Sequence, residues 1–244
     1  MVIRLFLLAA GIVSAQTDWR TWSGGNDGNR YSPLTQITKA NVKQLKVAWE
    51  FHSGDGDARG RTMIQCTPIV IGGVLYATTP TLMAVALDAA TGKELWRFDP
   101  VDARSRGVNR GVMYWESGAD KRILFSAGTL LYALDAKTGK IAPDFGADGR
   151  VDMTRDLDRD PAGAFNGSTT PGVIYKDLVI MGSSVGDNLF GNAIVALDAA
   201  TGKRIWHYQT LHHDIWDWDL PANPNLIRWN GKDALAQITK QGFV

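Results

Sequence analysis

An eight-residue sequence that occurs three times constrains the fold of this chain more than any other feature. The octet reads Ala-Leu-Asp-Ala-Xaa-Thr-Gly-Lys and begins at Ala86, Ala133 and Ala196. Successive copies are 47 and 63 residues apart, which is the spacing of repeat architectures. Each copy starts in a short apolar run, and two copies lead into alternating runs with aromatic residues, 94–98 and 204–208. Short strands that recur at such periods predict the blades of a β-propeller.

The second half of the octet, from Asp to Lys, has the composition of a turn between two strands. The aspartate can accept backbone N–H groups across the turn, and the glycine tolerates a positive φ. Further hairpin signals, Gly72-Gly73 and Lys176-Asp177, lie between matched apolar runs. These motifs are structural and carry no catalytic role. We predict an all-β fold, a β-propeller of four-stranded blades, with about four blades and a partial one in this chain.

Composition agrees with an all-β domain. The 244 residues include 26 glycines, and only 21% of the residues are charged. No long segment has apolar residues at helical spacing, so little helix is expected; residues 38–45, with Thr38 as N-cap, form the one plausible short helix. The formal net charge of +1, without a basic stripe, argues against nucleic acid and against an electrostatically held membrane surface.

The N-terminus has the features of an export signal. Arg4 precedes an apolar run, 5–13, and small residues at 13–15 provide a cleavage site before Gln16. Because this run is too short to span a bilayer, we expect a cleaved signal peptide, residues 1–15, and a periplasmic location. A buried first strand is the alternative. Residues 16–244 are expected to form one incomplete propeller. The single cysteine, Cys66, excludes an internal disulfide and is expected to be a buried, small apolar residue.

Residues 211–221 hold the densest group of chemically active side chains: Leu-His-His-Asp-Ile-Trp-Asp-Trp-Asp-Leu-Pro. Flat apolar rings beside ionisable groups suit a site that binds a planar, polar molecule and moves protons. A surface turn with tryptophans packed beneath it is the simpler alternative. His212 and His213 would point apart in a strand, so a role beside the site is favoured over a metal pair. Asp214 and Asp219 are expected to be turn or supporting residues.

Together these features resemble the pyrroloquinoline quinone (PQQ) dependent dehydrogenases, in particular the branch of membrane-type glucose dehydrogenase and its soluble periplasmic relatives. The resemblance runs from about Asp18 to Val244. It rests on the octets, the opening stretch 18–34, Asn109-Arg110-Gly111 with Tyr114-Trp115, and His213-Asp214-Ile215-Trp216-Asp217. The octet alone is weakly specific, because non-catalytic propellers of the outer-membrane assembly machinery carry similar repeats. The resemblance implies an eight-bladed propeller with PQQ and a calcium ion (Ca2+) on its axis.

The same resemblance implies roles for individual residues. Asp217 matches the catalytic aspartate, the general base that takes the hydroxyl proton as hydride passes to the quinone, and it also stands beside the metal. Arg110 matches an arginine that pairs with a PQQ carboxylate; an ion pair with Glu116 or an aspartate is the alternative. Further cofactor-binding positions are matched by Gln65, Thr169 and Ser184. Asp187 stands near a calcium-ligating glutamate and is one carbon shorter.

The sequence departs from the family between Ser184 and the third octet. Only eleven residues separate Ser184 from Ala196, where the family places a residue against the quinone face and a further calcium ligand. The first half of one blade looks spliced, in register, to the second half of the next, so that four strands still close a blade. The adjacent cysteines of many alcohol-oxidising relatives are absent before Asn109.

We therefore predict a periplasmic PQQ- and calcium-dependent dehydrogenase that oxidises an alcohol or aldose sugar and passes electrons to a quinone or cytochrome. We expect the chain to be the N-terminal part of such an enzyme, with little activity alone and with self-association that closes the propeller. A non-catalytic β-propeller binding scaffold is one alternative. A hydrolase or metal-binding β-protein built on His212 and His213 is the other. Neither substrate nor acceptor is specified by the sequence.

Overall fold

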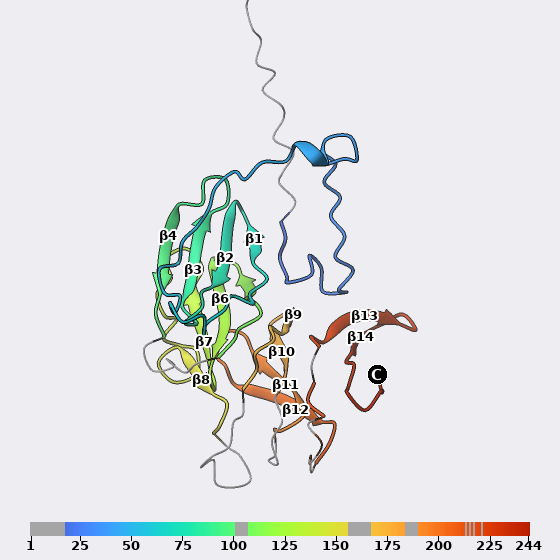
Figure 1. Ribbon diagram of the computed structural model, residues 1–244. Helices are drawn as coiled ribbons and strands as arrows, with labels where there is room; N and C mark the ends of the chain where they lie inside the picture. The colour runs from blue at the N-terminus through green and yellow to red at the C-terminus, as the bar shows by residue number, and fades with distance from the viewer. Residues whose placement is uncertain are drawn as a thin grey trace, which may run out of the picture.

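The computed structural model describes residues 18–100, 107–155, 167–183, 190–212, 214, 216, 218–220 and 222–244. This part of the chain is built almost wholly from antiparallel strands (Figure 1). The expected helix over 38–45 is reduced to a single 3-10 turn, η1 (Val42–Gln44). Its N-cap is Asn41 rather than Thr38, and the Asn41 side chain makes no capping bond to the turn but accepts the Thr38 amide at 2.7 Å. Among the described residues, no helix has the length and apolarity needed to cross a membrane.

Three four-stranded sheets follow one another along the chain, each a simple up-and-down meander. Sheet 1 contains β1 (Ile69–Ile71), β2 (Val74–Thr78), β3 (Ala84–Asp88) and β4 (Glu94–Phe98). Sheet 2 contains β5 (Met113–Ser117), β6 (Asp120–Ala127), β7 (Leu130–Asp135) and β8 (Arg150–Asp152). Sheet 3 contains β9 (Val173–Tyr175), β10 (Leu178–Gly182), β11 (Ala193–Asp198) and β12 (Arg204–Gln209). A two-stranded hairpin, β13 (Asn225–Trp229) and β14 (Lys232–Ala236), comes last.

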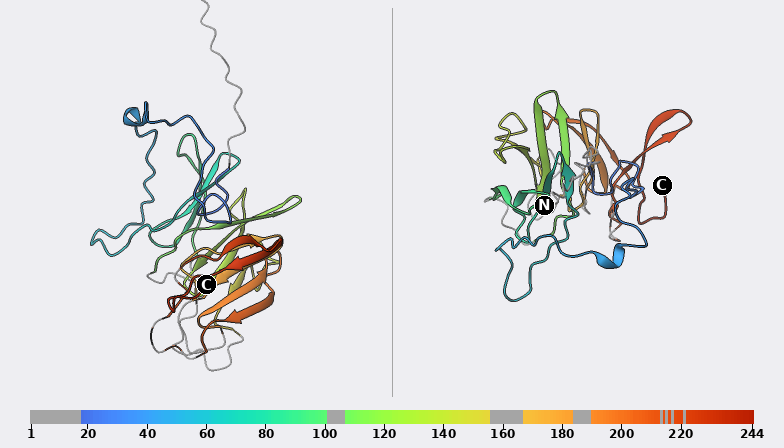
Figure 2. Two further views of the ribbon diagram at one scale, coloured as in Figure 1. Left: turned by 90° about the vertical axis from the view of Figure 1, so that its right-hand side faces the viewer. Right: turned by 90° about the horizontal axis from the view of Figure 1, so that it is seen from above.

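The sheets lie in chain order along an arc, with sheet 1 at one end and the β13–β14 hairpin at the other (Figures 1 and 2). This is part of a propeller, as predicted, but the described residues contain three complete sheets and a two-stranded one where about four and a partial one were expected. Residues 45–51 are one place where a strand-like sequence adds no strand. They alternate apolar and polar side chains like a strand, yet no strand is formed there in the described chain.

Each octet forms the predicted turn between the third and fourth strands of a sheet, or directly after the third strand. In the first copy, Asp88 Oδ1 accepts the backbone amides of Ala90 and Thr91 at 3.1 and 2.8 Å. Gly92 has a φ of 73°, where any other residue would be strained. The other two copies repeat both features through Asp135 with Gly139 and Asp198 with Gly202.

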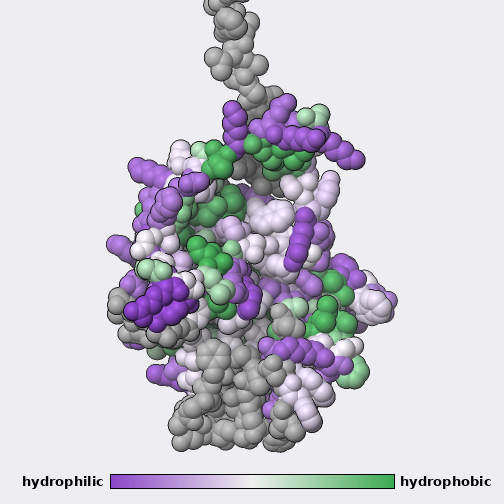
Figure 3. Space-filling model, in the orientation of Figure 1, coloured by the Kyte–Doolittle hydropathy of each residue, from purple (hydrophilic) through white to green (hydrophobic). Residues whose placement is uncertain are grey.

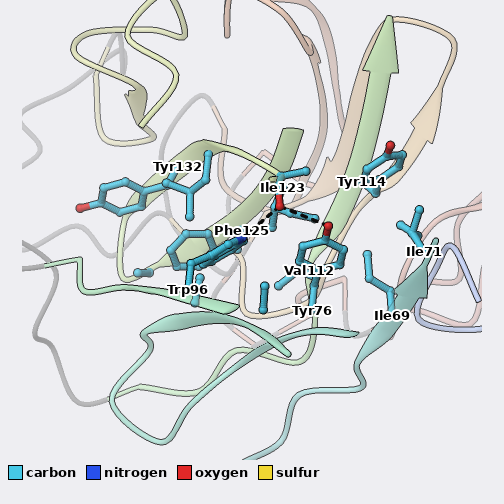
Figure 4. Packing of buried hydrophobic residues seen from close by; sticks show 14 of the residues in the cluster. Ile69, Ile71, Tyr76, Trp96, Val112, Tyr114, Ile123, Phe125 and Tyr132 are labelled. Atoms are coloured by element: carbon cyan, nitrogen blue, oxygen red, sulfur yellow. Dashed lines mark hydrogen bonds between the residues drawn. The ribbon is translucent and has the colours of Figure 1, made fainter. Parts of the chain in front are cut away.

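Tryptophan side chains join successive units through these turns. The indole of Trp96, on β4, donates to the Ala136 carbonyl at 3.0 Å and lies against Gly139 of the sheet 2 octet. Trp49 makes the equivalent bond to Ala89 at 3.1 Å and lies against Gly92. The core between sheets 1 and 2 also packs Tyr76, whose hydroxyl donates to the same carbonyl as Trp96 (Figure 4).

An N-terminal segment, residues 18–30, crosses the inner strands of the arc. Trp19 exchanges two backbone hydrogen bonds with Val70 of β1, at 2.8 and 2.9 Å. Asn26 donates through its side chain to Ile174 of β9 at 2.9 Å and accepts from the Leu226 amide of β13 at 2.8 Å. The segment therefore ties the two ends of the arc together. Beyond it, residues 31–47 leave several apolar side chains exposed, seen at the top of Figure 3.

Candidate functional site

The candidate site lies where the connections between sheets reach the inner strands. Backbone hydrogen bonds link these connections in series: the Thr67 amide donates to the Arg110 carbonyl at 2.9 Å, and the Arg110 amide donates to the Thr169 carbonyl at 2.8 Å. Three segments far apart in the sequence thus run side by side just before β1, β5 and β9. This series places Arg110 in the middle, between a segment of sheet 1 and a segment of sheet 3.

The side chains of Arg110 and Thr169 meet at this point. The Arg110 guanidinium donates to the Thr169 hydroxyl, and Arg110 is exposed while Thr169 is half-buried. The alternative pairing with Glu116 is not formed. Glu116 instead accepts from Arg20 and from the Tyr114 hydroxyl, the latter at 2.8 Å. Arg110 therefore presents a cation that forms no ion pair with a carboxylate of the described residues.

Asn109 holds Arg110 in place, a role that the sequence analysis did not assign. The Asn109 side chain is 5% exposed. Its Oδ1 accepts from the Gly111 amide at 2.9 Å and from the Thr78 hydroxyl at 3.1 Å, and its Nδ2 donates to the Ser126 carbonyl at 2.9 Å. One amide therefore joins β2, β6 and the residue after Arg110. Its position beside Arg110 in the Asn-Arg-Gly motif is the signal that could have identified it.

Gln65 lies on the same segment as Thr67 but is not bonded to Arg110 or Thr169. It is exposed, and its side-chain amide lies 2.9 Å from the Met63 sulfur. Its neighbour Cys66 is half-buried and accepts the Thr78 amide through Sγ at 3.3 Å. Burial raises the pKa of the Cys66 thiol, which keeps it protonated and unsuited to act as a nucleophile.

A cavity of about 180 Å³ adjoins Arg110 and Thr169. Its lining is mainly polar and includes Ser168, Thr170, Ser183 and Asp219. Pockets that enclose a drug-sized ligand are usually about 300–1,000 Å³. The described residues therefore form one polar wall of a binding site rather than a complete enclosure.

Three predicted site residues, Ser184, Asp187 and Asp217, lie outside the described residues. Their neighbours show the expected turn. Asp214 is 9% exposed, and its carboxylate accepts the amides of Trp216 and Trp218 at 2.8 and 2.7 Å. The prediction that Asp214 is a turn residue is confirmed. Trp216 is 69% exposed, so at least one of the two indoles is not packed beneath the turn.

The donor set at Arg110 and Thr169 fits a carboxylate-bearing planar cofactor such as PQQ. A guanidinium offers two parallel N–H groups to a carboxylate, and a hydroxyl can add a further donor. Calcium is a separate question, because both carboxylates predicted to hold it, those of Asp187 and Asp217, fall outside the described residues. Within the described part, no cluster of three or more histidine, cysteine, aspartate or glutamate side chains forms a metal site.

Comparisons with known proteins identify the same fold and family features. The family described as the PQQ glucose/ethanol/alcohol dehydrogenase β-propeller domain matches residues 19–189 and 185–244. Alcohol dehydrogenase (quinone), dehydrogenase subunit, of Gluconacetobacter polyoxogenes is 37% identical over 80% of this chain and 25% of its own length. Quinoprotein glucose dehydrogenase A of Acinetobacter calcoaceticus is 27% identical over 93% of this chain and 42% of its own. The crystal structure of quinohemoprotein alcohol dehydrogenase from Comamonas testosteroni superimposes with a TM-score of 0.62 at 23% identity, covering 94% of this chain and 47% of that one.

The extent of these matches is informative in two ways. The chain spans about two fifths of the length of the A. calcoaceticus glucose dehydrogenase. The alignment with that protein is 341 residues long, more than the 244 residues of the chain. The relative therefore has residues with no counterpart here. The two family matches meet at 185–189, where the sequence predicts a splice between blades.

Proposed function

Because the chain belongs to the PQQ-dependent dehydrogenase family, we propose that it forms part of an enzyme that oxidises an alcohol or aldose sugar and passes the electrons to a quinone or cytochrome. The observation that carries this proposal is the meeting of the Arg110 guanidinium and the Thr169 hydroxyl. Arg110 and Thr169 are 59 positions apart in the sequence. Together they offer donors to one anionic group at the point where the connections before β1, β5 and β9 run side by side. A binding scaffold would not need a fixed, exposed guanidinium there.

In this proposal, PQQ when bound supplies the two-electron acceptor for substrate oxidation. The chain's own residues would bind and orient the cofactor and accept the substrate proton. Arg110 pairs with a carboxylate of the cofactor through its planar fork, Thr169 donates its hydroxyl beside it, and Gln65 and Ser184 supply further polar contacts. Asp217 takes the hydroxyl proton of the substrate as general base. Asp187 and Asp217 are the proposed ligands of Ca2+, whose preference is for carboxylate oxygens.

The proposal has a simple consequence for Asp217. A divalent cation beside a carboxylate favours its ionised form, so Asp217 would remain able to accept a proton at neutral pH. We also propose that residues 1–15 are a cleavable signal peptide and that the protein acts in the periplasm, on the basis of Arg4 and the apolar run after it.

We further propose that the chain self-associates through the open face of β12. Two other tryptophans at the ends of repeats, Trp49 and Trp96, each cover an octet glycine, and Val151 covers the third at Gly202. Trp206, at the position of Trp96 in the third repeat, is left 37% exposed beside Tyr208 at 66%. Two copies, each covering 47% of the solved quinohemoprotein chain, carry about the strand content of one ring. Covering this apolar surface with a second copy would favour self-association.

Direct titration with PQQ in the presence of calcium tests the cofactor proposal. Arg110→Gln should weaken PQQ binding by about tenfold or more, because it removes a charge-assisted pair. Arg228→Gln is the matched control: Arg228 is an exposed arginine on β13 that pairs with Asp233 at 2.8 Å. The control should leave PQQ binding unchanged.

Equal effects of the two substitutions, or no saturable PQQ binding by the wild-type chain, would contradict the proposal. The second result would favour a non-catalytic propeller scaffold. Dye reduction with PQQ, calcium and an alcohol or sugar then measures how much oxidation these residues sustain. Asp217→Asn should abolish whatever oxidation is found while PQQ binding and the circular dichroism spectrum remain.

A further inference from the structure

The connection after β12 is held by one buried pair of side chains, Asn192 and Asp214. Asn192 Nδ2 donates to Asp214 Oδ2 at 2.6 Å. Asn192 is 0% exposed and Asp214 is 9% exposed. A short, buried bond from an amide to a carboxylate of this kind is among the stronger hydrogen bonds in proteins.

Asn192 is itself rigidly held. It has a φ of 47°, a left-handed conformation that asparagine tolerates better than most residues. Its carbonyl accepts both the backbone amide and the hydroxyl of Thr210, at 2.9 and 2.6 Å. Next to it, the Gly191 carbonyl accepts from the Gln209 side chain at 3.1 Å. The start of β11 and the end of β12 thus fix Asn192 before its side chain reaches Asp214.

Asp214 in turn fixes the backbone of residues that follow it. Its Oδ1 accepts the Trp216 amide at 2.8 Å, and its Oδ2 accepts the Trp218 amide at 2.7 Å. The two amides belong to the residues on either side of position 217. A single carboxylate, oriented by Asn192, therefore holds the backbone before and after that position.

We propose that Asn192 and Asp214, here called the bracket, are positioning residues for the proton-accepting loop 214–218. The inference rests on the proposed function, in which Asp217 is the general base. A base must lie within hydrogen-bond reach of the proton it takes, and small displacements of such a group lower the rate strongly. The bracket supplies that precision from β11 and β12 without itself touching substrate or cofactor.

The chemistry explains why one partner is an amide and the other an acid. Asp214 must accept three N–H groups at once, and only an ionised carboxylate has enough acceptor sites for them. Asn192 must donate, so an aspartate at position 192 would replace an attraction with a like-charge repulsion at 2.6 Å. The bracket should therefore tolerate neither Asn192→Asp nor Asp214→Asn.

Selective 15N-tryptophan labelling of the full chain tests the bracket without relying on turnover. Trp216→Phe and Trp218→Phe assign the two backbone amides. In the wild type, both amides should exchange slowly. Asn192→Ala should speed their exchange by about tenfold or more, the factor expected when a charge-assisted hydrogen bond is lost.

Asn223→Ala is the matched control. Asn223 is another buried asparagine, 6% exposed, on the same connection, and its amide donates to the Pro171 carbonyl rather than to Asp214. It should leave the two amides unchanged. The proposal is overturned if Asn192→Ala leaves their exchange within about twofold of wild type, or if Asn223→Ala accelerates it equally.

Dye reduction by the chain loaded with PQQ and calcium adds a functional readout. A positioning role predicts that Asn192→Ala lowers the turnover number while KM and the PQQ dissociation constant stay the same. If PQQ does not bind, the proposed function fails, and the bracket is then judged by the amide exchange alone. If PQQ binds but this part of the enzyme sustains no oxidation by itself, the amide exchange is again the deciding measurement. If oxidation is present and Asn192→Ala leaves it unaltered, the bracket is structural only and the positioning proposal fails.

Discussion

Trp96→Ala tests whether indole contacts between repeats stabilise the arc. Trp96 is 8% exposed, lies against Gly139 and has its ring centroid 5.9 Å from that of Tyr76. Removing a buried tryptophan side chain costs about 3–5 kcal/mol. The indole hydrogen bond adds little, because the Ala136 carbonyl keeps the Tyr76 hydroxyl at 3.2 Å as a partner. We expect a loss of about 4 kcal/mol, a large part of the roughly 5–15 kcal/mol by which domains are stable.

Urea unfolding followed by far-ultraviolet circular dichroism measures this loss, and the chain contains its own control. Trp206 occupies the same place after the third octet that Trp96 occupies after the first, but it is 37% exposed and its indole covers no octet glycine. Trp206→Ala should cost about 1 kcal/mol or less in a monomer. Trp96→Phe should cost about 1–2 kcal/mol, between the losses for Trp206→Ala and Trp96→Ala, because most of the packing is kept. Equal losses for Trp96→Ala and Trp206→Ala would refute the argument.

Three further changes test other contacts. Burial alone would raise the pKa of Asp55, but hydrogen bonds from Ser53, Thr79 and Thr81 outweigh it and lower the pKa to about 2. Because the folded-state pKa lies below the unfolded value of 3.8, the stability from Asp55 is present above that pH and is lost as pH falls towards 2. Asp55→Asn should remove at most about 2 kcal/mol of this pH dependence, measured by urea unfolding at successive pH values. An unchanged acid transition would count against this role of Asp55. Arg122→Met should lower the free energy of unfolding in urea by about 2 kcal/mol. This is less than for a wholly buried ion pair, because Asp120 and Asp144 are 41% and 61% exposed and stay solvated. A loss under about 0.5 kcal/mol would show that the bond from Arg122 to the Ala200 carbonyl is dispensable. Asn26→Ala should cost about 1 kcal/mol and speed proteolysis within 18–30, and equal cleavage of both proteins would contradict the role of this segment as a tie.

Local turn chemistry made much of the fold predictable. The octets and the Gly72-Gly73 and Lys176-Asp177 hairpins lie where their sequences indicate, because an aspartate, a glycine or a lysine with positive φ sets each turn within a few residues. Arg110 and Thr169 were predicted to serve one ligand and do meet. Their assignment came from a family resemblance, which already encodes three-dimensional proximity; their role in binding PQQ stays a prediction.

Contacts between distant segments were not predictable in the same way. Nothing in the spacing of Asn192 and Asp214, or of Asn109 and Ser126, indicates that their side chains bond. Residues 45–51 have the alternation of a strand, but alternation reports an apolar face and not a hydrogen-bonded neighbour. Trp49 uses that face on the sheet 1 octet, although no strand is formed there in the described chain. The helix expected over 38–45 was wrong beyond the single 3-10 turn at Val42–Gln44.

Sheet 3 spans the point where the two family matches overlap, and its strand pairing shows no break there. Strand β10 belongs to the first family match and β11 to the second, yet the two pair without a shift from Leu178 with Asp198 to Gly182 with Ile194. Pairing tolerates the join because each repeat supplies the same strand lengths, alternation and octet turn.

Contacts between sheets 2 and 3 differ from those made by the first two octets. The third octet glycine meets Val151 instead of an indole, and a cavity of about 280 Å³ lies beside it, lined in part by Met153, Met181 and Phe190. Arg122 reaches across to the Ala200 carbonyl at 2.6 Å, one residue beyond the carbonyl position that the tryptophans use in the other octets. The octet turn is thus common to the repeats, whereas the side chain that covers the octet glycine is an indole in the first two copies and Val151 in the third.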